Sequence, residues 1–229
     1  MIEISENNIE NNKTLIGKTK PIISLDYGSC VYKTTTELSD IDRLIIVEDG
    51  LFNEDDYVNK TYQTINTKNS PNIDEQYIQI STWKQMIENY DIRAIESLWL
   101  PNENIYCGSS IKIPFKDIFV LDLEKLRRCI SAICSNAWVK SKKKFQYNTP
   151  DNDYKAKKSL FHVFRLFMFG IQIAKYGKII NYQEANYLWE EIYNTETNDW
   201  NYYKEKYQPL RNKLHSQFVE LTDKKYWRK

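Results

Sequence analysis

Two kinds of hydrophobic pattern divide this chain. Between residues 21 and 120 the apolar residues form short runs bounded by glycine, proline and polar residues, as is typical of β-strands. After residue 120, apolar residues recur three and four positions apart, which predicts amphipathic helices. The pattern predicts an α+β protein, with an N-terminal mixed β-sheet and flanking helices followed by a C-terminal helical half. Strands are expected over residues 22–25, 43–47 and 77–80.

Residue types at the ends of the helical patterns help to place the predicted helices. Ser81 or Thr82 can cap the first helix, and Asp122 can cap the second. Asn181 and Glu184 have the spacing of a capping box, which predicts that a helix begins at Asn181. The other helices are expected over residues 81–98, 123–142, 154–176 and about 200–221.

Polar segments separate these elements. Residues 1–20 form a polar N-terminal segment to which we assign no function. Residues 53–72 are polar and are interpreted as a surface excursion, and residues 140–153 as a basic, polar connection. We therefore expect three parts, a polar segment over 1–20, a sheet domain over 21–120 and a helical domain over 121–229, with a cleft where the two domains meet.

Composition excludes several classes of protein. The 32 basic and 31 acidic side chains nearly cancel, so no overall charge demands a nucleic acid or an anionic membrane as partner. No apolar stretch approaches the roughly 20 residues that span a bilayer, and no secretory signal pattern opens the sequence. We expect a soluble, cytoplasmic protein without a membrane partner. The four cysteines form no CxxC pair and are expected to be reduced thiols.

The candidate chemistry lies in the N-terminal half. Asp40 and Asp42 precede an apolar run, and in a strand they would share one face, roughly 7 Å apart at Cα, with Ile41 directed into the core. Two carboxylates this close repel each other unless a hard divalent cation binds them. We expect Mg²⁺, with Mn²⁺ as an alternative. Taken alone, the Asp-Ile-Asp sequence would be interpreted as a strand-edge turn with solvated carboxylates.

A possible phosphate-binding turn changes that interpretation. Gly28 allows backbone N–H groups to approach phosphate oxygens closely, and Ser29 adds a hydroxyl. A third carboxylate is expected just before the helix that contains Trp83, from Asp74 or else Glu75, and we choose Asp74. Phosphoryl-type transfer needs three things: binding of the triphosphate, a bound metal ion and activation of the incoming hydroxyl. The pattern therefore predicts nucleotidyl transfer.

The order of these motifs resembles a known superfamily. Gly-Ser, a spacer, Ser-Asp-x-Asp and a hydrophobic strand are similar to the signature of DNA polymerase beta-type nucleotidyltransferases, in particular the small predicted nucleotidyltransferases of bacteria and phages. The resemblance extends from about residue 22 to about residue 180. Its further matches are Asp74, Trp83, the run 96–101 and the series Lys158, His162 and Arg165.

The resemblance implies a polymerase beta-like catalytic domain over 21–120 and a function. A nucleoside monophosphate would pass from a nucleoside triphosphate, with ATP as the expected donor, to an RNA, protein or small-molecule acceptor, and pyrophosphate would leave. The implied mechanism uses two metal ions, and the implied catalytic and metal-binding residues are Asp40, Asp42 and Asp74. The implied nucleotide-binding residues are Gly28, Ser29, Lys33, Ser39, Lys158, His162 and Arg165.

Several interpretations stay open. Lys33 stands where many members of the superfamily carry a second glycine, so either the loop has another shape or Lys33 itself contacts a phosphate. This departure favours an alternative, a catalytically silent nucleotide-binding or antitoxin-like interaction module. A cyclic or oligonucleotide synthase is a third option, for which the chain is short. Lys158, His162 and Arg165 share one face of a helix. This face either binds the triphosphate or the acceptor, or is simply the solvent-exposed side of an otherwise buried helix. Glu96 is interpreted as a buried acid paired with Arg93 or Arg165.

Overall fold

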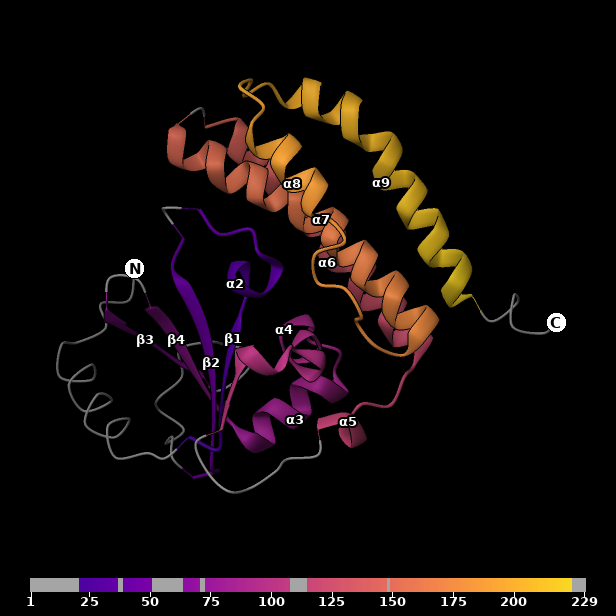
Figure 1. Ribbon diagram of the computed structural model, residues 1–229. Helices are drawn as coiled ribbons and strands as arrows, with labels where there is room; N and C mark the ends of the chain where they lie inside the picture. The colour runs from indigo at the N-terminus through magenta and orange to yellow at the C-terminus, as the bar shows by residue number, and fades with distance from the viewer. Residues whose placement is uncertain are drawn as a thin grey trace. The chain divides into compact units, whose positions relative to one another are not determined.

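A computed structural model describes most of the chain (Figure 1). The chain forms two compact units. The sheet unit comprises the described residues within Met1–Val31, Thr35–Glu88 and Leu100–Ile118, and the helical unit those within Tyr32–Thr34, Asn89–Trp99 and Phe119–Lys229. The described residues are 21–36, 39–50, 64–70, 73–107, 115–147 and 149–223.

The sheet unit contains a mixed five-stranded sheet in the order β3-β4-β2-β1-β5. β2 and β4 are parallel, and the pairs β1 and β2, β1 and β5, and β3 and β4 are antiparallel. With the helices that follow, this sheet confirms the predicted α+β class. The strands are β1 (Ile23–Tyr27), β2 (Ile41–Val47), β3 (Thr64–Ser70), β4 (Ile73–Gln79) and β5 (Ile105–Cys107).

Burial along the two parallel strands changes from one end to the other. The last four residues of β2 and of β4 are buried, whereas the first three of each are half-exposed. The apolar residues 44–47 explain why this end is enclosed on both faces. Because parallel strands begin at the same edge of a sheet, the half-exposed beginnings of β2 and β4 lie next to each other.

Short helices accompany the sheet. The helix α3 contacts β2 and β4 through a face that buries Trp83, Met86 and Ile87, which have helical spacing. It begins at Ile80, so the prediction that Ser81 or Thr82 caps it was wrong. Instead, the N–H and hydroxyl of Ser81 both donate to Oδ1 of Asp49, which follows β2. The helices are α2 (Ser29–Tyr32), α3 (Ile80–Glu88), α5 (Phe115–Ile118) and the 3-10 helix η2 (Asn102–Asn104).

In the helical unit, three long helices, α6, α7 and α9, pack against one another. The middle of α7 is buried almost all round, and α6 buries a stripe that includes Leu126, Ile130 and Ala137. The elements are α4 (Ile92–Glu96), the 3-10 helix η1 (Ser97–Trp99), α6 (Leu123–Phe145), α7 (Pro150–Tyr176), α8 (Asn186–Tyr193) and α9 (Trp200–Thr222).

The ends of these helices test the predicted caps. Asp122 caps α6 as predicted, because its side chain accepts hydrogen bonds from the N–H groups of Glu124 and Lys125. The predicted connection over 140–153 is wrong for most of its length, since α6 continues to Phe145 and α7 begins at Pro150. Lysines in the last turn of α6 interact favourably with the helix dipole, and proline is well tolerated in a first turn.

Two further boundaries differ from the prediction. The helix expected over 81–98 is divided, because Tyr90 has φ +61° and Asp91 caps the new helix α4 by accepting from the N–H of Arg93. The predicted capping box is absent: α8 begins at Asn186, and the carboxylate of Glu184 accepts a hydrogen bond from Gln172 Nε2 instead. In both places a tertiary contact or a backbone turn overrides the local sequence signal.

The segment over 53–72 also contained a missed strand. Its residues 64–70 form β3, at the edge of the sheet, while 53–63 and 71–72 lie outside the described residues. An edge strand pairs on one side only and can therefore be polar. The predicted N-terminal segment, 1–20, also lies outside the described residues.

Two expectations about the chain as a whole can be compared with its described part. Of the helices described, none combines the length and hydropathy that crossing a bilayer requires. Cys30, Cys129 and Cys134 are free thiols, in line with the expectation of reduced cysteines.

Candidate functional site

Three neighbouring strands bring two aspartates together in the sheet unit. In the sheet register, Tyr27 of β1 lies opposite Asp42 of β2, and Asp42 lies opposite Asp74 of β4. We call the two aspartates, Asp42 and Asp74, the carboxylate row. Neighbouring strands are about 4.8 Å apart, so the side chains of Asp42 and Asp74 project side by side from one face. Both lie at the half-exposed ends of their strands.

The register also distinguishes between the two candidates for a third carboxylate. Side chains alternate along a strand, so Asp74 shares the face of Asp42 and Glu75 projects from the other face. On that face Glu75 has two partners: it accepts a hydrogen bond from Tyr77 and forms an ion pair with Arg43. The geometry therefore favours Asp74, the residue chosen from the sequence, as the partner of Asp42.

Gly28 lies directly against the carboxylate of Asp42. A Cβ atom built on Gly28 would be 2.5 Å from Oδ2 of Asp42 and 3.3 Å from its Cγ. The residue also has φ +72°, a conformation that side chains disfavour. Both constraints favour glycine at this position. The close contact also shows that the backbone leading from β1 into α2 lies beside Asp42.

The residues just before β2 shape a turn. The backbone N–H of Thr36 donates to Oγ of Ser39 over 2.9 Å, and the N–H of Ser39 donates back to the carbonyl of Thr36 over 2.9 Å. The Ser39 hydroxyl is therefore part of the turn itself. Asp40 follows this turn and precedes the first residue of β2, so the strand alternation from which we predicted its direction does not extend to it. Ile41 is half-exposed rather than part of the core.

Two of the remaining predicted residues lie on or next to α2. Ser29 is the first residue of α2 and is buried, with 6% of its surface exposed. Lys33, just after α2, is exposed and has φ +58°. A left-handed conformation favours glycine, so a lysine is unusual at this position.

The acid pair fits one mode of magnesium binding and not another. Within the described part of the chain, no three histidine, cysteine, aspartate or glutamate residues are grouped to hold a metal ion. A cage made by the protein alone is thus not formed there. However, Mg²⁺ is commonly held by one or two carboxylates together with substrate phosphates and water. Asp42 and Asp74 have the hard oxygen ligands and the adjacency that this second mode requires.

The other face of the same strands carries a charge network that sequence analysis did not single out. Asp26 of β1, Arg43 of β2 and Glu75 of β4 are aligned in the register, one residue along from the carboxylate row. We call them the arginine row. The arginine directly after Asp42 was visible in the sequence, but its two acidic partners lie 17 and 32 residues away. Strand alignment was needed to find them.

In the helical unit, the predicted cationic stripe is largely a packed cluster. Arg165 Nη2 lies 2.7 Å from His162 Nδ1 and 3.8 Å from Glu96 Oε1, and its guanidinium lies 3.6 Å from the centre of the Tyr32 ring. Glu96 was expected to pair with Arg93 or Arg165, and Arg165 is the partner. Arg93 forms an ion pair with Asp91 instead.

The electrostatics of this cluster follow from its burial. Burial raises the pKa of Glu96, although the nearby Arg165 guanidinium and the Tyr32 hydroxyl oppose this shift. Burial also lowers the pKa of His162 well below its ordinary value, and the charges of Arg165, Lys140 and Lys158 lower it further. His162 is therefore a neutral imidazole near pH 7. Lys158 is exposed, in contrast to Arg165.

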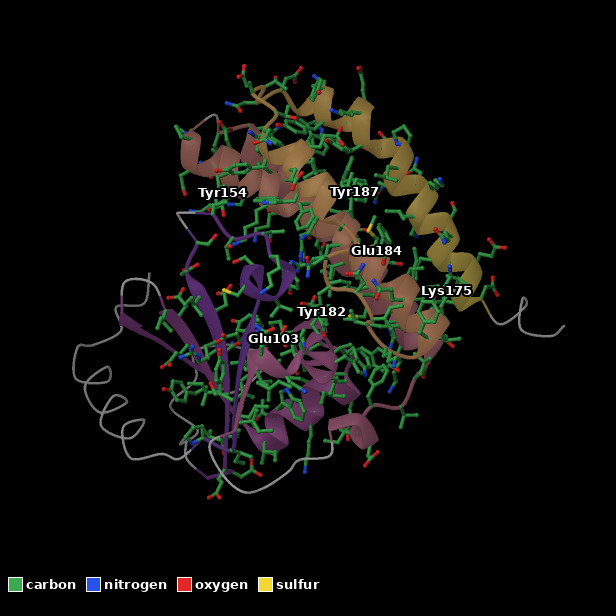
Figure 2. The ribbon with its side chains drawn as sticks, viewed as in Figure 1. Glu103, Tyr154, Lys175, Tyr182, Glu184 and Tyr187 are labelled. Atoms are coloured by element: carbon green, nitrogen blue, oxygen red, sulfur yellow. The ribbon has the colours of Figure 1, made fainter. Side chains whose placement is uncertain are left out.

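Aromatic side chains complete the cluster. Tyr182, labelled in Figure 2, donates its hydroxyl to the backbone carbonyl of Glu96 and lies in ring contact with Tyr32 and Phe169. Asn186 Nδ2 donates to the carbonyl of Tyr32 over 2.8 Å. Arg165 is thus enclosed by aromatic and hydrogen-bonding neighbours, which explains why only 9% of its surface is exposed.

Comparison with known proteins adds little. The sequence matches no protein-family model, and no curated protein is significantly similar to it. Among solved structures, the chain is similar to a nucleotidyltransferase-like protein from Exiguobacterium sibiricum, with 12% identity and a TM-score of 0.34. The match covers 96% of this chain and 76% of the other. Similarity at this level supports no statement about activity.

Proposed function

We propose that this protein is a nucleotidyltransferase, which moves a nucleoside monophosphate from a nucleoside triphosphate to the hydroxyl of an acceptor. ATP is the expected donor, and an RNA, a protein or a small molecule is the acceptor. The observation that carries the proposal is the close approach of Gly28 to Asp42, which is itself aligned with Asp74. A glycine turn beside paired carboxylates is suited to a metal-bound triphosphate.

The residues have distinct roles in this proposal. Asp42 and Asp74 would hold Mg²⁺ together with phosphate oxygens of the nucleotide, and the ion would neutralise charge that develops on the phosphates. Asp40 is not grouped with them as a third ligand within the described residues. The backbone at Gly28 and the Ser29 hydroxyl bind phosphate oxygens, and Ser39 shapes the turn that leads to Asp40. These residues come from separate strands and turns whose relative positions are fixed by the sheet.

The cationic residues are assigned more narrowly than the sequence suggested. Lys33 and Lys158 are exposed and are proposed to contact phosphates of the nucleotide or of the acceptor. Arg165 and His162 are engaged with each other, and Arg165 also pairs with Glu96. We therefore propose that these two residues stabilise the helical unit and do not contact the nucleotide.

The reaction balances without a further reagent. The acceptor oxygen forms a bond to the α-phosphorus, and the bond from that phosphorus to the oxygen bridging to the β-phosphorus breaks. Pyrophosphate leaves with the bonding electrons, and a carboxylate of the site accepts the hydroxyl proton. We assign this last role to Asp74, which is half-exposed and aligned with Asp42.

Label transfer tests the proposal. The protein is incubated with each α-³²P-labelled nucleoside triphosphate, Mg²⁺ and total cellular RNA and protein, and label is then sought on macromolecules and in small products. We expect transfer by the wild type, and loss of at least about 100-fold in Asp42→Asn and Asp74→Asn, because each removes a metal ligand. Asp151→Asn is the matched control, since Asp151 is exposed on α7 and pairs with Lys155. Equal transfer by the wild type and Asp42→Asn would refute the proposal.

One observation favours a second candidate function. No three histidine, cysteine, aspartate or glutamate side chains gather to hold a metal within the described residues. A catalytically silent nucleotide-binding or antitoxin-like module would tolerate this feature. Such a protein would bind the nucleotide with Mg²⁺ and yield no labelled product with any acceptor, which separates it from the enzyme.

A further inference from the structure

The arginine row ties the three strands of the candidate site together. Arg43 Nε lies 3.0 Å from Oδ1 of Asp26 on β1, and Arg43 Nη1 lies 3.9 Å from Oε1 of Glu75 on β4. A single guanidinium on the middle strand therefore reaches carboxylates on both neighbours. The planar, forked shape of the group makes this bridge possible, and a lysine could not form it.

Two tyrosines hold the far oxygens of the same carboxylates. The Tyr106 hydroxyl donates to Oδ2 of Asp26 over 3.0 Å, and the Tyr77 hydroxyl donates to Oε2 of Glu75 over 2.9 Å. The Arg43 guanidinium also lies 5.4 Å from the centre of the Tyr106 ring. Each carboxylate is thus held from two sides, which fixes its orientation and that of Arg43.

This network is only partly open to water. The side chain of Arg43 is 26% exposed, and those of Asp26 and Glu75 are 12% and 11% exposed. Ion pairs with this degree of burial are screened less than surface pairs and hold a defined geometry. The arginine row is therefore suited to a positioning role.

The arginine row adjoins the carboxylate row on the opposite face of the sheet. Arg43 is the next residue after Asp42, and Glu75 is the next after Asp74. The two rows together contain four carboxylates and one basic side chain, Arg43. Asp42 and Asp74 repel each other, and they lie near the ends of their strands, where ladders open most easily.

From these contacts we propose that Arg43 is a positioning residue for the metal site. It holds β1, β2 and β4 in register at the point where Gly28, Asp42 and Asp74 meet, so that the two aspartates bind a divalent cation together. This inference rests on the proposed function, because it assumes that the carboxylate row binds a cation.

Charge and position have opposite effects on cation binding at this point, which makes the inference testable. If Arg43 acted only through its positive charge, its removal would strengthen cation binding by the nearby aspartates. If Arg43 positions the aspartates, its removal weakens cation binding. Arg43→Gln removes the charge and the bridge, whereas Arg43→Lys keeps the charge and loses only the bridge.

The experiment measures Mn²⁺ binding to the full chain in the presence of a non-hydrolysable ATP analogue, which supplies the phosphate ligands. Enhancement of water-proton relaxation distinguishes the Mn²⁺–nucleotide complex bound to the protein from the same complex free in solution. We expect the Kd to rise roughly tenfold in both Arg43 variants, as for loss of other residues that orient metal ligands. The matched control is Arg93→Lys, which alters an arginine–carboxylate pair in the helical unit, where Arg93 Nη2 lies 2.8 Å from Asp91 Oδ2. It should bind Mn²⁺ as the wild type does. Circular dichroism confirms that each variant is folded at the temperature used.

The outcomes separate this inference from the proposed function. If the wild type binds Mn²⁺ and Asp42→Asn does not, but Arg43→Lys keeps wild-type affinity, the positioning role is wrong and the proposed function stands. Tighter binding by Arg43→Gln would also overturn the positioning role. If the wild type and Asp42→Asn show the same Mn²⁺ binding, or none, both the proposed function and the inference fail.

Discussion

Gly28 is under two constraints that can be separated by mutation. Its backbone adopts φ +72°, and its α-carbon faces the carboxylate of Asp42. Gly177, at the end of α7, has nearly the same φ, +70°, but a Cβ atom there would meet nothing within 4 Å. The two glycines share the backbone strain of a substitution and differ in the contact that a side chain would make.

Substitution of both glycines by alanine tests the role of this contact. We expect Gly177→Ala to lower the free energy of unfolding by about 1–2 kcal/mol through backbone strain alone, with Mn²⁺ binding unchanged. Gly28→Ala should cost at least as much, about 1–3 kcal/mol, and should also displace Asp42 and weaken Mn²⁺ binding. Urea unfolding and Mn²⁺ titration measure the two effects. Unchanged Mn²⁺ affinity in folded Gly28→Ala would show that the contact has no role in the site.

At the scale of a single element, α7 carries a histidine whose ionisation opposes folding. His162 contacts Arg165, which also pairs with Glu96, and the charges of Lys140 and Lys158 also act on the imidazole. The pKa of His162 is lowered mainly by burial, so the folded chain keeps the imidazole neutral. The unfolded chain takes up a proton below the ordinary pKa of 6.5 and is thereby favoured as the pH falls.

Stability should therefore fall between pH 7 and pH 5, and His162→Gln should reduce that fall. Below pH 6.5, the wild type should lose up to about 1.4 kcal/mol per pH unit more than the variant. The comparison with the variant removes most of the contribution from other groups, including Glu96, whose raised pKa acts in the opposite direction. Urea unfolding at several pH values measures the difference. Parallel pH profiles would mean that His162 has the same pKa in the folded and the unfolded chain, and would contradict this prediction.

Elements with strong local signals were predicted, and those that depend on distant contacts were not. The buried part of β2 and the cap at Asp122 follow from apolar runs and from N-cap chemistry that are visible within a few residues. The edge strand β3 is polar and is specified by pairing with β4, and Glu184 is drawn to Gln172 rather than to a helix end. Local propensity cannot encode either of these tertiary contacts.

At the scale of the whole chain, the sequence could identify the candidate site only in part. Gly28 and Asp42 were found from their neighbours, but the alignment of Asp42 with Asp74 depends on a parallel strand pair across 32 residues. The enclosure of Arg165 depends on Tyr32 and Glu96, which are even more distant in the sequence. Helical spacing alone could not show that Arg165 is enclosed while Lys158 stays exposed.

The central claim is that Asp42 and Asp74 bind a nucleoside triphosphate through a shared divalent cation. Isothermal titration of a non-hydrolysable ATP analogue into the protein, with and without Mg²⁺, tests it most directly. We predict that wild-type binding requires Mg²⁺, and that Asp42→Asn and Asp74→Asn each weaken it by at least about tenfold. Nucleotide binding that is indifferent to Mg²⁺, or that is equally strong in the wild type and Asp42→Asn, would contradict the claim.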